Sequence, residues 1–84
     1  MAVYTFKKRD NGEIHIFEGE MNEAGNACTS EKKSICDDAK KSESKNIDIN
    51  HNCLTQRKTR IKAAEIGRTV CGNCIKEFYT TYKD

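Results

Sequence analysis

Cys71-Gly72-Asn73-Cys74 is the stretch that decides how this chain folds. A turn of this kind can aim both cysteine sulfurs at one metal ion, about 2.3 Å away. A helix that follows directly adds N-terminal amides, which favour the thiolate charge. Gly72 is expected to relieve crowding within the turn. The sequence therefore predicts Cys71 and Cys74 as the first two ligands of a metal site.

The residues after this motif have the periodicity of an amphipathic helix. Cys74, Ile75, Phe78, Tyr79 and Tyr82 follow one another at spacings of one, three, one and three. This spacing is typical of one face of a helix. We therefore expect a C-terminal helix whose aromatic side chains belong to the core.

The composition indicates that hydrophobic burial needs help from a crosslink. The chain has 84 residues, of which 36% are hydrophobic and 33% charged, with no Trp, and its mean hydropathy is −0.85. A chain of this size buries only about 60% of the surface that it exposes when unfolded. Five cysteines would leave one thiol unpaired in a disulfide framework, and the N-terminus lacks the apolar run of a signal peptide. One zinc ion in a reducing cytoplasm is therefore favoured over disulfides.

Two further ligands are needed, because structural zinc takes four nitrogen or sulfur donors. Cys28 ranks third, and His15, on a predicted strand, competes with Cys36 for the fourth place. Cys53 and His51 rank last, because residues so close in sequence chelate one ion awkwardly. Cys53 is predicted to be a small buried apolar residue and His51 a surface residue.

The N-terminal part has the pattern of a β-hairpin. Residues 3–6 are rich in strand formers, and the Asp-Asn-Gly sequence at 10–12 favours a turn. Residues 13–17 then alternate, with Ile14 and Ile16 on one face and their neighbours on the other.

The rest of the chain predicts one more helix and a polar loop region. Residues 55–66 are dominated by helix formers and are followed by Gly67, a favourable residue for ending a helix. Residues 37–46 have the composition of a solvated, mobile loop, and residues 47–49 suggest a short strand. The predicted fold is a small α+β zinc-stapled domain over 1–84, with an N-terminal hairpin, a polar loop region and a C-terminal helix after the CxxC motif.

Charge is distributed unevenly along the chain. Residues 18–48 carry eight acidic and five basic side chains, whereas residues 54–70 carry five basic side chains and one acidic. The basic segment predicts a surface for nucleic acid or a partner, through contacts with phosphates. Its predicted contact residues are Arg57, Lys58, Arg60 and Lys62. The cations of residues 7–9 could extend this contact surface, although the simpler interpretation is that they are the solvated end of the hairpin.

The order of His15, Cys28, Cys71 and Cys74 resembles that of short phage and mobile-element proteins of the zinc-ribbon or treble-clef type. The chain departs from that pattern because Cys28 is not followed by Gly and because two further cysteines are present. The resemblance implies a protein that binds and blocks host machinery, such as nucleic acid or a nucleoprotein complex, including CRISPR complexes.

The sequence argues against an enzyme. It contains no paired carboxylates, no nucleophile–base arrangement and no phosphate-binding glycine loop, and four protein ligands would leave no open position on zinc. No apolar run reaches the length of a membrane span, and no small-molecule substrate is expected. Two alternatives remain: a protein-only inhibitor or adaptor that uses the acidic region 18–38, and a dithiol redox protein. The CGNC motif resembles the CGPC of thioredoxins, but the chain has no proline and only ten residues follow Cys74.

Overall fold

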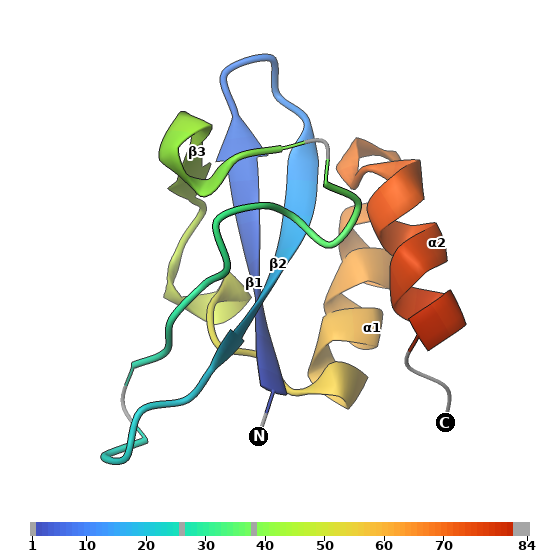
Figure 1. Ribbon diagram of the computed structural model, residues 1–84. Helices are drawn as coiled ribbons and strands as arrows, with labels where there is room; N and C mark the ends of the chain where they lie inside the picture. The colour runs from blue at the N-terminus through green and yellow to red at the C-terminus, as the bar shows by residue number, and fades with distance from the viewer. Residues whose placement is uncertain (1, 26, 38, 82–84) are drawn as a thin grey trace.

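The computed structural model describes residues 2–25, 27–37 and 39–81, which form a three-stranded antiparallel sheet and two helices (Figure 1). The strand order is β2-β1-β3. The α+β class predicted from the sequence is confirmed. The elements are β1 (Ala2–Arg9), β2 (Ile14–Glu20), β3 (Ser44–Asn46), α1 (Gln56–Ile66) and α2 (Gly72–Thr81), with short 3-10 helices at Lys41–Glu43, Ile49–His51 and Gly67–Thr69.

The predicted hairpin is confirmed as β1 and β2. Their register runs from Ala2 opposite Glu20 to Lys8 opposite Ile14. Gly12 closes the turn with a φ of +88°, a left-handed conformation that costs glycine little. The local turn chemistry thus fixes which strand faces are buried.

One face of this hairpin packs against the helices and forms the main core. Tyr4 and Phe6 of β1 and their β2 neighbours Ile14 and Ile16 are buried there. Phe78 of α2 contacts Tyr4 edge to face, with ring centroids 5.2 Å apart. Burial of these large side chains, at roughly 25 cal/mol per Å² of apolar surface, is the principal hydrophobic contribution to the fold.

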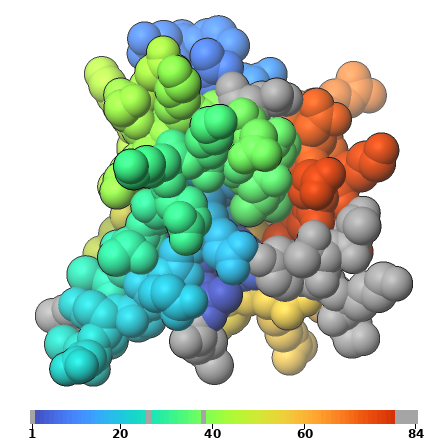
Figure 2. Space-filling model, in the orientation of Figure 1, coloured from blue at the N-terminus to red at the C-terminus, as the bar shows by residue number. Residues whose placement is uncertain are grey.

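The other face of the hairpin is covered by residues 28–37 and 39–41, which we call the covering segment. It crosses in front of the strands in Figure 1, and in Figure 2 its green atoms hide the middle of the sheet. Its backbone also bonds the outer edge of β2, since the N–H groups of Thr29 and Ile35 donate to Glu20 and Ile16 over 2.9 Å each. The segment therefore protects a strand edge that would otherwise be open to pairing.

Gly19 allows this close approach. A Cβ atom at Gly19 would lie 1.8 Å from the backbone oxygen of Thr29, far inside van der Waals contact. Only a residue without a side chain fits at this position of β2.

The polar region at 37–46 has more structure than its composition predicts. Ala39 is only 1% exposed, and β3 pairs with β1 through Lys7 opposite Asn46 and Arg9 opposite Ser44. The third strand is Ser44–Asn46, so the prediction of a short strand at 47–49 is wrong, and Ile49–His51 form a 3-10 helix instead. The mobility of this region stays a prediction.

Both predicted helices are confirmed. Thr55 caps α1 by accepting a hydrogen bond from the Lys58 backbone N–H, and Gly67 follows the last turn with a φ of +81°. In α2, Phe78 is buried, but Tyr79 is 47% exposed, so the prediction that Tyr79 belongs to the core is wrong. A helix turns by 100° per residue, and Tyr79 lies at the margin of the apolar face. Tyr82, assigned to the same face, lies outside the described residues.

None of the helices in the described part of the chain has the length and apolar character needed to cross a membrane.

Candidate metal centre

Four side chains from three distant parts of the chain converge beside β2. His15 comes from β2 and Cys36 from the covering segment, whereas Cys71 directly precedes α2 and Cys74 lies in its first turn. One ligand atom from each lies within 4.8 Å of all the others. The cluster therefore joins the sheet, the covering segment and the C-terminal helix at one point.

The distances within this cluster are short and similar. Cys36 Sγ lies 3.3 Å from Cys74 Sγ and 3.9 Å from Cys71 Sγ. His15 Nδ1 lies 3.5 Å from both Cys36 Sγ and Cys74 Sγ. Four donors so arranged can surround one cation, so the cluster could hold a metal ion.

Burial makes the thiols of Cys71 and Cys74 hard to ionise without a cation. Cys74 is fully buried, and its burial raises its pKa far above the usual range, an effect that the Ile16 backbone N–H opposes and nearby Cys36 reinforces. Burial also raises the pKa of Cys71, although the N–H groups of Cys74 and Asn73 offset part of this rise. Sulfurs this close repel one another as thiolates. A bound cation would remove that repulsion and displace the thiol protons.

Glu13 completes the arrangement around the histidine. Its Oε1 is hydrogen-bonded to His15 Nε2, so Nε2 carries the proton when Nδ1 faces the cluster. Metal-bound histidines usually donate their second ring N–H in this way, which fixes the ring orientation. Ser34 Oγ lies 3.1 Å from Cys36 Sγ and supports that ligand similarly. Sequence reasoning missed both residues, although Glu13 lies two positions before His15 and thus on the same side of the chain.

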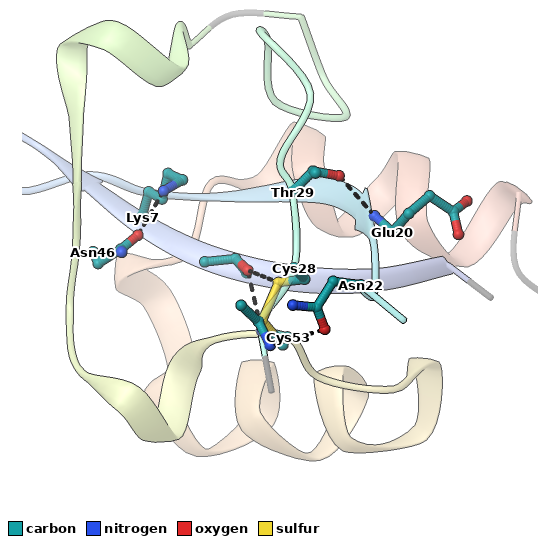
Figure 3. The surroundings of a disulfide bond; sticks show 9 residues. Lys7, Glu20, Asn22, Cys28, Thr29, Asn46 and Cys53 are labelled. Atoms are coloured by element: carbon teal, nitrogen blue, oxygen red, sulfur yellow. Dashed lines mark hydrogen bonds between the residues drawn. A yellow bond between two sulfur atoms is a disulfide. The ribbon is translucent and has the colours of Figure 1, made fainter. Parts of the chain in front are cut away.

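The structure corrects the prediction of Cys28 as a metal ligand. Cys28 forms a disulfide with Cys53, with Cα atoms 5.8 Å apart (Figure 3). The prediction that Cys53 is a free buried residue is wrong for the same reason. His15 and Cys36, which competed for the fourth place, are both in the cluster. The sequence favours zinc over disulfides, but the structure corrects this expectation, because the five cysteines form one disulfide and leave a group of three free thiols.

Gly72 does not have the role expected of it. Nothing lies within 4 Å of a Cβ atom built at this position, and the φ angle of Gly72 is not positive. Crowding within the CxxC turn therefore does not demand glycine here.

The predicted basic residues all lie on α1 but face different directions. Arg57 and Lys58 are exposed, whereas Arg60 and Lys62 are half-buried. Arg57, Arg60 and Tyr79 line a hollow of about 400 Å³ on one side of the helix. Lys58 and Lys62 line an adjoining hollow, which shares Ile61 with the first, and there Lys62 Nζ lies 3.2 Å from Glu65 Oε1. We call the Arg57–Arg60–Tyr79 side the α1 basic surface.

The two histidines and the hairpin cations also differ from expectation. His51 is half-buried rather than a free surface residue. Its Nδ1 lies 2.6 Å from Asp48 Oδ1, and its ring contacts the Phe6 ring edge to face. Lys7 is only 8% exposed, so the interpretation of residues 7–9 as a solvated hairpin end does not hold for it.

Comparison of the chain with family models, with curated proteins and with solved structures finds no match. The resemblance to phage zinc-ribbon proteins therefore rests on its own four residues, and Cys28 among them lies in the disulfide.

Proposed function

We propose that this chain is a non-catalytic binding module held together by one zinc ion on His15, Cys36, Cys71 and Cys74. The observation that carries the proposal is the size of the cluster. Zinc bond lengths of about 2.3 Å to sulfur and 2.0–2.1 Å to nitrogen give tetrahedral edges of ~3.8 Å between sulfurs and ~3.6 Å between sulfur and nitrogen. Four of the six corresponding distances are 3.3 and 3.9 Å between sulfurs and 3.5 Å, twice, from nitrogen to sulfur, and all six lie within 4.8 Å.

The arrangement supports a structural role for the ion. Four protein ligands close the coordination sphere, so no position is left for a substrate. Because the ligands come from segments far apart in sequence, binding free energy becomes folding free energy. A chain with only 36% hydrophobic residues gains most from such a contribution.

We propose the α1 basic surface as the contact for nucleic acid or a nucleoprotein complex. Arg57 and Arg60 can meet phosphates, and Tyr79, 47% exposed beside them, offers a ring on which a base can stack. A host-directed role, such as a phage-encoded inhibitor, is supported by the resemblance described above. The protein-only alternative through the acidic region 18–38 is supported by a hollow of about 500 Å³ that includes Glu18, Glu31 and Asp37.

The zinc proposal is tested by native mass spectrometry with matched serine variants. The wild-type chain and the Cys28→Ser/Cys53→Ser variant should each carry one zinc ion, whereas Cys36→Ser and Cys74→Ser should lose it. Substitution with Co²⁺ should give the absorption of a tetrahedral thiolate site in the first two proteins only. Full metal-free folding of the wild type, with native helix content after chelation, would contradict a structural zinc ion. It would leave the CxxC pair open to the dithiol redox alternative.

The nucleic-acid proposal is tested separately by salt-dependent binding. The Arg57→Gln/Arg60→Gln variant should bind a short DNA or RNA duplex more weakly, with a log K against log salt slope reduced by about two. Lys32→Gln/Lys33→Gln, in the covering segment, is the control and should leave the slope unchanged. Absence of any retention at about 50 mM salt would favour the protein-only alternative.

A further inference from the structure

Lys7 is a buried cation without a counter-charge. It lies in the interior of β1 and is only 8% exposed. Its Nζ donates to Asn46 Oδ1 over 2.5 Å and lies 6.0 Å from the centre of the Phe17 ring. In the part of the chain that the structure describes, no carboxylate lies within ion-pair distance of Lys7. Lysines are almost never buried unless they are paired.

A hollow of about 640 Å³ opens beside this lysine, bounded by β1, β3, residues that follow β2, the covering segment and the residues before α1. Lys41 supplies a second cation to its wall, and Ser30 and Asn46 supply polar groups. None of the described residues that line it is Asp or Glu. Burial lowers the pKa of Lys7, and the charge of Lys41 lowers it further. The hollow is therefore lined by two ammonium groups, and no carboxylate among its described lining residues neutralises their positive charge.

The geometry points to this hollow as a binding site for one phosphate-sized oxyanion, either free or as the terminal phosphoryl group of a larger ligand. Lys7 and Lys41 would each donate a charge-assisted hydrogen bond to it. The amide group of Asn46, whose oxygen already accepts from Lys7, keeps its N–H donors for the same ligand. An oxyanion would supply the negative charge that the buried lysine lacks.

The disulfide joins two parts of the wall of this hollow. Cys28 and Cys53 both line it, and their bond ties the covering segment to the residues before α1 (Figure 3). Thr5 Oγ1 accepts a hydrogen bond from the Cys53 backbone N–H over 3.1 Å and lies 3.7 Å from Cys28 Sγ. A site preformed in this way loses little free energy to reorganisation when a ligand binds.

The test is a titration of the zinc-loaded, disulfide-intact chain with inorganic phosphate at constant ionic strength, followed by NMR. We expect saturable shifts around the hollow. Lys7→Met and Lys41→Met should each weaken binding roughly tenfold or more. Lys8→Met is the matched control, because Lys8 neighbours Lys7 but is exposed, and it should bind phosphate as the wild type does. Lys41 is exposed, so its variant decides the matter if Lys7→Met fails to fold.

A second arm separates the two sources of the oxyanion. A short oligonucleotide with a 5′-phosphate is compared with inorganic phosphate and with the same oligonucleotide lacking the phosphate. If the phosphorylated oligonucleotide binds more tightly than the other two ligands, and this advantage is lost in Lys41→Met, the site takes a phosphoryl group on a larger ligand. If it binds with the same affinity as inorganic phosphate, the site takes a free oxyanion. Shifts that do not saturate, or that are the same in the Lys7, Lys41 and Lys8 variants, would overturn the inference. The α1 basic surface is not part of this hollow, so its own test is unaffected.

Discussion

Removal of the Cys28–Cys53 disulfide should lower the free energy of unfolding by about 3.5 kcal/mol and leave metal binding intact. The two cysteines are separated by 25 residues. In the chain-entropy treatment, closing a loop of that length removes about 12 cal/mol/K from the unfolded chain, which is ~3.5 kcal/mol at 25 °C. A domain of this size is stable by roughly 4–13 kcal/mol. The disulfide therefore accounts for a large share of the net stability.

The assay is urea and thermal unfolding of the Cys28→Ser/Cys53→Ser variant beside the wild type, with the same excess of zinc in both samples. The midpoint of thermal unfolding should fall by about 14–28 °C. Wild-type protein treated with a phosphine reductant should unfold like the double variant, because both lack the same covalent bond.

Two results would refute this reasoning. Loss of zinc from the double variant would show that Cys28 or Cys53 is a ligand, as the spacing of the sequence suggested for Cys28. Unchanged unfolding midpoints for both the variant and the reduced wild type would show that the two thiols are not joined in solution.

Three further predictions follow from local contacts. Gly19→Ala should lower the free energy of unfolding by about 1–3 kcal/mol or more, because the new Cβ would meet the backbone of the covering segment at 1.8 Å. Gly72→Ala is the control, because the space at that position is open. It should be neutral or slightly stabilising in the same urea experiment. Thr55→Ala should cost about 1 kcal/mol through loss of the α1 cap, and Thr55→Ser should restore most of it. The hydrogen bond from His51 holds the pKa of the Asp48 carboxyl below 3.8, so its stabilising contribution is present above that pH and is lost as the pH falls through the lowered pKa. An Asp48 titration by carbon NMR should show this, and His51→Ala should raise the pKa towards 3.8.

Much of the secondary structure could be predicted from short stretches of sequence. The Asp-Asn-Gly turn and the alternation after it specify the hairpin, and Thr55 and Gly67 mark the two ends of α1. The CxxC motif and the apolar spacing after it specify the start of α2 and one half of the candidate metal centre. These features depend on interactions within a few residues, such as turns, caps and the period of a strand or helix.

Which distant side chains meet was decided by the tertiary structure. The sequence ranked Cys28 above Cys36 as a ligand beside the CxxC pair, which is wrong, and it could not show that Lys7 is buried. The free energy of closing a flexible loop changes by only about 0.6 kcal/mol for each doubling of its length. Sequence spacing therefore discriminates weakly among pairings of cysteines over long separations. The choice was made by the path of the covering segment across the sheet, which brings Cys28 to Cys53 and Cys36 to His15 and Cys74.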